Sequence, residues 1–154
     1  FEIMGLKMPH LFSGQVVHGF GRGGRELDCP TANLDGDTVE AFPPEAEDGI
    51  YVGYAKVDNG ELYPMVMSIG NNPQYGNKQR SIEIHILHKF ENDFYESTVR
   101  AVVLDLLREM QKFKSLDLLK NAIAKDKKDA IDYLNQNGNF SKWNNDEFFF
   151  NHKS

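Results

Sequence analysis

The strongest constraint on the fold is an Asn-Gly turn between two strand-like segments. Gly49–Val57 and Glu61–Ile69 are both apolar strand candidates, and only Asp58-Asn59-Gly60 separates them. Asn-Gly accepts the positive φ angles of a tight hairpin, so the two segments are expected to pair antiparallel. This hairpin favours an antiparallel sheet over a parallel one.

Three further strands and two loops are predicted from short-range patterns. Strands are expected over Ser13–His18, Arg80–His88 and Thr98–Leu107, while Asp35–Asp48 and Gly70–Gly76 are predicted to be surface loops. The strands do not alternate with helices, so the usual signature of a parallel α/β sheet is missing. The pattern is typical of a closed or nearly closed antiparallel barrel.

One helix is predicted late in the chain. Ser115 is a suitable N-cap, and the helix is expected to end near Asn137-Gly138. Apolar residues recur at helical spacing along it, at Leu116, Leu119, Ile123, Ala130, Ile131 and Leu134. We expect an N-terminal extension over 1–9, a barrel domain over 10–137 with its helix at about 115–137, and a tail over 138–154 that docks on the domain.

Composition excludes several classes of protein. The chain has 154 residues, enough for one domain, and its net charge of −6 argues against a nucleic-acid partner. Cys29 is the single cysteine, so neither a disulfide framework nor a thiolate zinc site is expected, and a reducing, cytoplasmic compartment is predicted. No apolar run approaches about 18 residues, so no membrane span is expected.

The segment Gly19–Asn33 is the main candidate for binding phosphate. Four glycines and two arginines lie close together and precede a Thr/Asn pair. Glycines let backbone N–H groups approach a phosphate, and arginine adds paired donors for the same oxygens. Thr31 and Asn33 offer neutral oxygens of the kind that Mg²⁺ accepts. The segment is therefore interpreted as a nucleotide-phosphate clamp with an adjoining metal site.

Two familiar glycine motifs do not fit this segment. The spacing Gly19-x-Gly21-x-x-Gly24 matches a dinucleotide fingerprint, but Pro30 and the absence of a helical period rule out the required helix. A Walker A loop would need Lys and Ser/Thr where Arg25 and Glu26 stand. A glycine loop with no ligand stays open as an alternative.

The strand candidate around Glu83 carries the possible catalytic group. Ile82, Ile84 and Ile86 share one face, while Glu83 and His85 share the other. Glu83 is interpreted either as part of a solvated outer face or as a general base on a rigid strand. His85 and His88 face opposite ways, so they make a poor metal pair.

The segment before the helix could bind a planar ligand. Arg108 and Gln111 offer hydrogen bonds, and Phe113 offers a stacking ring. The alternative is a charged loop with one anchoring phenylalanine.

Taken together, the ordered motifs resemble the riboflavin kinase family, in its stand-alone eukaryotic form. The resemblance runs from about residue 10 to about residue 137, and its most specific part is Pro30-Thr31-Ala32-Asn33 in register with the glycine loop. The other motifs that carry it are Gly14-x-Val16-Val17-x-Gly19-x-Gly21-x-Gly23, Gly49-Ile50-Tyr51-x-Gly53, Ser68-Ile69-Gly70, Glu83-x-His85-Ile86-x-His88, Phe94-Tyr95, Leu107-Arg108 and Phe113-x-Ser115-Leu116.

The resemblance implies a six-stranded antiparallel β-barrel with a C-terminal α-helix packed on it. It implies transfer of the γ-phosphate of ATP to the 5′-hydroxyl of riboflavin, giving FMN and ADP. Riboflavin and ATP would be the small-molecule partners of a monomer, and Mg²⁺ the metal, with Mn²⁺ or Zn²⁺ as other choices. A flavin-binding electron-transfer or reductase barrel without kinase activity is the alternative function.

The resemblance also implies roles for particular residues. Glu83 would be the catalytic base, and Thr31 and Asn33 would bind the metal. The residues expected on the ATP side are Gly19, Arg25, Thr31, Asn33, Ile86, His88 and Tyr95, and those expected on the flavin side are Arg108, Gln111 and Phe113. The chain departs from the family pattern in that Arg25 stands where many members have Lys, and Glu109 where the family has Pro.

Overall fold

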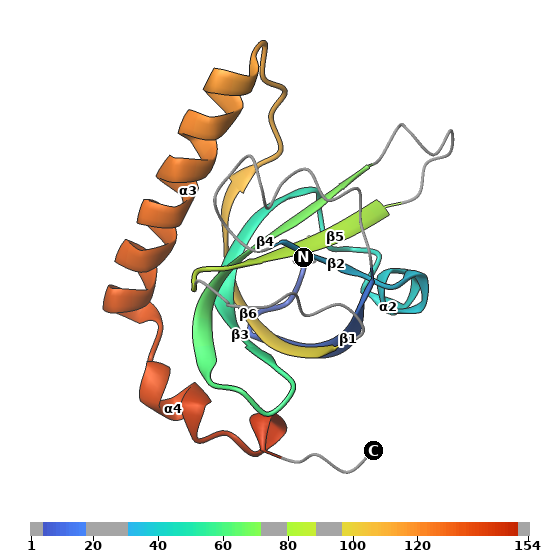
Figure 1. Ribbon diagram of the computed structural model, residues 1–154, viewed down its shortest axis with the longest axis vertical. Helices are drawn as coiled ribbons and strands as arrows, with labels where there is room; N and C mark the ends of the chain where they lie inside the picture. The colour runs from blue at the N-terminus through green and yellow to red at the C-terminus, as the bar shows by residue number, and fades with distance from the viewer. Residues whose placement is uncertain (1–4, 18–30, 72–79, 89–96, 151–154) are drawn as a thin grey trace, which may run out of the picture.

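The computed structural model describes residues 5–17, 31–71, 80–88 and 97–150. Within this part of the chain, six strands form a closed barrel in the order β1-β2-β5-β4-β3-β6 (Figure 1). Every neighbouring pair of strands is antiparallel. The strands are β1 (His10–Val17), β2 (Thr31–Leu34), β3 (Gly49–Val57), β4 (Leu62–Asn71), β5 (Arg80–Ile86) and β6 (Thr98–Glu109). The predicted antiparallel barrel is therefore confirmed.

The hairpin of β3 and β4 forms as the Asn-Gly turn predicted. Gly49 lies opposite Ile69 and Lys56 opposite Leu62, with Asp58 in the left-handed region at φ 48°. On its other edge β3 pairs with β6, and the register shifts at two points along this pair. At Gly53 an added Cβ would lie 1.8 Å from the carbonyl oxygen of Val102, so this close approach of β3 and β6 requires glycine.

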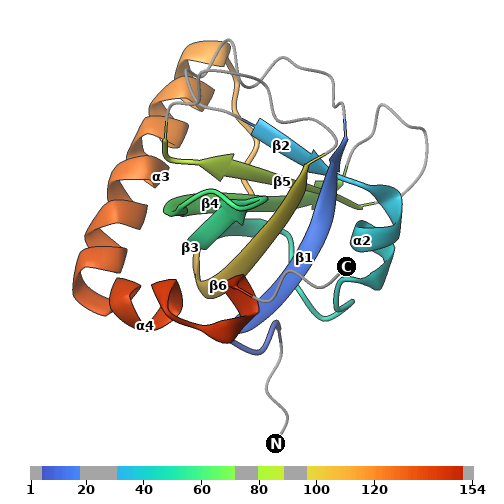
Figure 2. The ribbon, with the colours of Figure 1, turned by 60° about the horizontal axis from the view of Figure 1, so that its bottom comes forward.

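In the described part of the chain, two apolar clusters stabilise the fold. The first fills the barrel and includes Ile82, Ile84 and Ile86, as the alternation of β5 predicted. The second lies outside the wall, where Ala130 and Leu134 of α3 (Leu116–Asn137) pack on the barrel. Figures 1 and 2 show α3 running along one side of the barrel.

The N-terminus of α3 is at the predicted position, but its apolar face is narrower than predicted. The Ser115 hydroxyl accepts a hydrogen bond from the Leu118 N–H at 3.1 Å, which confirms the N-cap. Leu116 and Ile131, both predicted on the buried face, are exposed. Leu116 belongs to the first turn, which extends past the strands (Figure 1). Ile131 follows buried Ala130, and one residue turns a helix by about 100°, which points it away from the wall.

The prediction of a surface loop over Asp35–Asp48 is wrong in part. Residues Gly36–Ala41 form a short helix, α2, and Phe42 directly after it is buried in the barrel cluster. A carboxylate oxygen of Asp35 accepts hydrogen bonds from the Gln15 N–H and from the Thr38 hydroxyl. The contacts with β1 and with the barrel interior hold the segment in place, and local composition could not reveal them.

Several strand ends also differ from the predicted ones. β1 begins at His10, and β5 ends at Ile86. β4 and β6 run further than predicted, to Asn71 and Glu109. The extra residues are paired, since Asn71 lies opposite Arg80 and Gly49 opposite Glu109. Pairing with a neighbouring strand therefore keeps these residues in a strand, although their local sequence is typical of a loop.

After α3 the chain runs across one end of the barrel (Figure 1). It forms α4 (Phe140–Asn144) and the short 3₁₀ helix η2 (Glu147–Phe149), and Trp143 and Phe149 are buried in the outer cluster. The Lys56 ammonium donates a hydrogen bond to the Phe149 carbonyl oxygen at 2.9 Å. Among the described helices, none combines the length and the apolar content that crossing a membrane requires.

Candidate functional site

The register between β2 and β5 brings the central candidate residues together. Thr31 lies directly opposite His85, and Asn33 directly opposite Glu83. The intervening Ala32 is fully buried, so Thr31 and Asn33 share the outer face. Two polar residues of β2 and two of β5 therefore form one group of four on the barrel wall, which we call the wall quartet.

Glu83 occupies the middle of a row across three strands. Its neighbour is Asn33 on one side and Ser68 of β4 on the other. The Glu83 side chain is 38% exposed, and partial burial raises the pKa of its carboxyl above the usual range. The carboxylate is on the outer face, which both interpretations required, but its environment is less polar than open water.

His85 contacts a candidate residue on each of the two strands. Its Nδ1 is 3.2 Å from the Thr31 hydroxyl oxygen, and its Nε2 is 3.8 Å from a Glu83 carboxylate oxygen. An ionised carboxylate only accepts hydrogen bonds, so the tautomer with a proton on Nε2 suits this position. Nδ1 then accepts, and the Thr31 hydroxyl donates.

The surroundings keep the His85 ring neutral. Burial and, to a lesser degree, the Lys127 charge lower its pKa to about 4, while Asp126 acts in the opposite direction. The His85 side chain is only 13% exposed. Its neighbour on β4 is Val66, which belongs to the outer cluster together with residues of α3, so α3 covers this part of the wall. A neutral imidazole has one acceptor and one donor nitrogen, as the two contacts require.

Arg108 of β6 forms an ion pair with α3. Its Nε and one terminal nitrogen donate to the two carboxylate oxygens of Asp126 at 2.8 and 2.9 Å. Its guanidinium carbon also lies 5.6 Å from the centre of the Phe113 ring. Phe113 is half-buried and Gln111 is exposed, and both stand in the segment that joins β6 to α3. Arg108 therefore links this segment, through Phe113, to the middle of α3.

Two candidates for the ATP side lie away from the wall quartet. The Ile86 side chain is fully buried inside the barrel, so only its backbone could meet a nucleotide. His88 is exposed and stacks on the Tyr63 ring at 3.9 Å, and Tyr63 packs against the barrel cluster. His88 follows the end of β5, so the strand alternation on which its predicted direction rested does not extend to it. The candidates Gly19, Arg25 and Tyr95 lie outside the described residues.

Sequence reasoning misses the partners of the candidate residues. It treats His85 only as half of a metal pair, and it gives no role to Asp126. A partner for Asp126 could have been predicted from the sequence, because a carboxylate on the apolar side of a helix needs a charged partner. His85 carries none beyond sharing a strand face with Glu83, because its contact with Thr31 joins residues 54 positions apart.

Thr31 and Asn33 fit a loosely held divalent cation. Within the described residues, no three His, Cys, Asp or Glu side chains group as a metal cage would require. Mg²⁺ commonly keeps several waters and takes the rest of its ligands from one or two protein groups and from substrate phosphates. Because Thr31 uses its proton toward His85, its oxygen lone pairs remain available to a cation.

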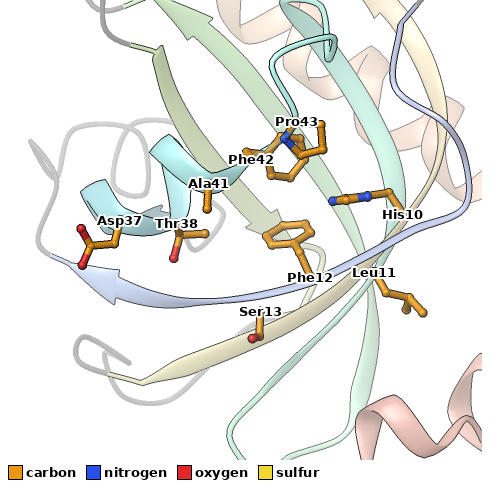
Figure 3. Close-up of a pocket in the computed structure, with 9 residues that line it drawn as sticks. All are labelled: His10, Leu11, Phe12, Ser13, Asp37, Thr38, Ala41, Phe42 and Pro43. Atoms are coloured by element: carbon orange, nitrogen blue, oxygen red, sulfur yellow. The ribbon is translucent and has the colours of Figure 1, made fainter.

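A groove of about 410 Å³ lies elsewhere, between β1 and α2 (Figure 3). His10, Phe12 and Phe42 form its aromatic part, and their rings contact one another at 5.0 to 6.0 Å. Figures 1 and 2 place α2 on the side of the barrel opposite α3. Among the described candidate site residues, none lines this groove.

A family model, a curated relative and a solved structure point to the same family. A family model described as Flavokinase: Riboflavin kinase matches residues 6–134. The riboflavin kinase of Homo sapiens is 42% identical over 123 residues, which cover 80% of this chain and 79% of the human protein. A crystal structure of riboflavin kinase from Trypanosoma brucei is 28% identical with a TM-score of 0.73, and the match covers 94% of this chain and 90% of that one.

A second solved structure carries a different name. It is called a macrolide-efflux protein from Streptococcus pneumoniae, and it is 32% identical with a TM-score of 0.67. The match covers 80% of this chain but only 38% of that protein, so the name describes a much longer molecule.

Proposed function

The chain belongs to the riboflavin kinase family and is an ATP-dependent kinase that converts riboflavin to FMN, and we propose that Glu83 is the general base of this reaction. The supporting observation is the wall quartet, in which the strand that carries Glu83 lies beside the strand that carries Thr31 and Asn33. A base and a phosphate-binding pair must be close together for a hydroxyl to attack a phosphate.

In the proposed mechanism Glu83 accepts the proton of the riboflavin 5′-hydroxyl. The hydroxyl oxygen then forms a bond to the γ-phosphorus of ATP while the bond from that phosphorus to the bridging β–γ oxygen breaks, and ADP leaves. A carboxylate whose pKa is raised by partial burial is a better proton acceptor than one in open water. Most of the remaining rate acceleration would come from positioning and charge stabilisation, as is usual in phosphoryl transfer.

Thr31 and Asn33 are proposed to hold Mg²⁺ with the ATP phosphates. Bound there, the cation would neutralise phosphate charge. Gly19, Arg25, His88, Tyr95 and the backbone at Ile86 are proposed to contact ATP. Mn²⁺ or Zn²⁺ in place of Mg²⁺, a monomeric state and a cytoplasmic location stay predictions.

On the flavin side, Arg108 is proposed to act mainly through its pair with Asp126. The pair joins the middle of α3 to β6, and the Arg108 guanidinium also contacts the Phe113 ring. Phe113 offers the ring on which the flavin could stack, and the exposed Gln111 could reach its polar edge.

The family assignment does not favour the alternative of a flavin carrier without kinase activity, and one experiment separates the two. The chain is incubated with riboflavin, ATP and Mg²⁺, and FMN and ADP are quantified by chromatography. We expect equal amounts of the two products, and only a trace from the Glu83→Gln variant. Folded protein that binds riboflavin but forms no FMN would support the carrier instead.

A further inference from the structure

His85 lies between the two groups that the reaction needs. One ring nitrogen is 3.2 Å from the Thr31 hydroxyl, and the other is 3.8 Å from the Glu83 carboxylate. The first distance is a hydrogen bond, whereas the second is an electrostatic contact slightly longer than one. A single ring therefore contacts both side chains at once.

We propose that His85 is a positioning residue, whose Nδ1 orients the Thr31 hydroxyl and whose Nε2–H orients the Glu83 carboxylate. The proposal rests on the roles proposed above for Thr31 and Glu83. One rigid ring would thereby set the distance between the phosphate-binding oxygen and the base.

The ring is well supported for this role. It extends from the middle of a strand paired on both sides, opposite Thr31 on β2 and Val66 on β4. A threonine hydroxyl can otherwise occupy several rotamers, and a hydrogen bond to a fixed acceptor selects one of them. From α3, Asp126 and Lys127 act electrostatically on the ring, and Asp126 is itself paired with Arg108.

Two substitutions separate the two contacts. In His85→Asn the side-chain amide oxygen can replace Nδ1 as an acceptor for Thr31, but nothing reaches the Nε2 position. In His85→Gln the longer amide can replace the Nε2–H toward Glu83, but no acceptor remains at the Nδ1 position. Both replacements are planar and polar, and urea unfolding would verify that each variant is folded.

Two quantities are measured for each variant. Calorimetry gives the dissociation constant of Mg·ADP without turnover, and steady-state kinetics gives kcat. For His85→Gln we expect Mg·ADP to bind about fivefold more weakly, the usual value of one hydrogen bond, with riboflavin binding within about twofold. For His85→Asn we expect Mg·ADP binding within about twofold of wild type and a kcat about tenfold lower, because Glu83 is less well oriented. His10→Gln, in the groove beside α2, is the control and should change neither quantity.

A double-mutant cycle tests the Thr31 contact directly. If the hydroxyl acts through His85, Thr31→Val should weaken Mg·ADP binding less in the His85→Gln background than in wild type. Strictly additive effects would overturn the proposal. Wild-type behaviour of both His85 variants, or equal losses of both quantities in each, would also overturn it, because either result leaves His85 with no more than a packing role.

Failure of the proposal is distinguishable from failure of the proposed function. If Glu83→Gln and Thr31→Ala behave as wild type, the roles on which His85 depends are wrong. If those two variants lose activity while the His85 variants do not, only the role of His85 is refuted. Each His85 variant removes one contact, so wild-type behaviour of either folded variant would refute the role proposed for the contact that it removes.

Discussion

The Arg108 guanidinium and the Asp126 carboxylate form a two-point ion pair at 2.8 and 2.9 Å that ties β6 to α3. The Asp126 side chain is almost fully buried, and the Arg108 side chain is partly buried. Paired charges in such a position depend strongly on each other, because a partner left alone is poorly solvated. The pair therefore positions α3 beside the wall quartet.

Removing the charge of Asp126 should loosen α3. We expect Asp126→Asn to lower the free energy of unfolding by about 1–3 kcal/mol, since two charge-assisted hydrogen bonds are weakened. Urea unfolding followed by circular dichroism measures this. The KM for riboflavin should rise as well, because Phe113 and Gln111 are no longer held in place.

Asp129→Asn is the matched control for this variant. Asp129 is also on α3, but its partner Lys125 is largely exposed. Such a pair contributes about 0.5 kcal/mol or less. Equal losses in the two variants would show that the Arg108–Asp126 pair has no special role.

Replacing Glu83 should remove chemistry but retain binding. Glu83→Gln keeps the size of the side chain and loses its basicity, so kcat should fall by roughly 10²–10⁴-fold. Riboflavin affinity, followed by quenching of flavin fluorescence, should stay within about twofold. Glu40→Gln on α2 serves as a control for the loss of an exposed carboxylate. Turnover near wild type in Glu83→Gln would refute the proposed base.

Removing the Thr31 hydroxyl should affect the nucleotide more than the flavin. We expect Thr31→Ala to weaken Mg·ADP binding by about tenfold and riboflavin binding by less than about twofold, because only the nucleotide depends on the metal. Calorimetry with each ligand separately measures both values. Thr38→Ala, near the groove beside α2, controls for the loss of a threonine. Comparable effects on the two ligands would exclude Thr31 from the metal site.

As the pH is lowered, kcat/KM should begin to fall at a higher pH than it would if the base were a glutamate with an ordinary pKa. Partial burial raises the pKa of Glu83 above its ordinary value. Only the deprotonated carboxylate can accept the proton, so kcat/KM should be at its full value above the raised pKa and fall about tenfold per pH unit below it. The measurement is a pH profile of kcat/KM at saturating Mg²⁺. An acid limb at or below about pH 4.3, where an unperturbed glutamate titrates, would contradict the assignment of this limb to Glu83.

The tail should contribute to stability through one phenylalanine and not through its neighbour. The Phe149 side chain is 1% exposed in the outer cluster, whereas Phe150 is 53% exposed. We expect Phe149→Ala to cost about 3–5 kcal/mol and Phe150→Ala about 1 kcal/mol or less. Urea unfolding of the two variants gives both values, and similar losses would show that the tail is not anchored at Phe149.

Much of the fold was predictable because its signals are local. The Asn-Gly turn specifies the β3–β4 hairpin, Ser115 specifies the start of α3, and the three isoleucines of β5 specify the inner face. The same alternation put Glu83 and His85 on the outer face. Asp35–Asp48 was not predictable in the same way, since α2 depends on contacts from Asp35 to β1 and from Phe42 to the barrel interior.

The sequence by itself determined which residues share a face, because the period of a strand is local and needs no partner. It could not determine which strands lie side by side, so only the tertiary structure placed Thr31 opposite His85 and Asn33 opposite Glu83. The same holds for Arg108 and Asp126, which meet only when α3 packs on β6. The physical reason is that backbone hydrogen bonds can form between any two strands, whatever their side chains. Which strands pair is therefore decided by the closure of the whole barrel.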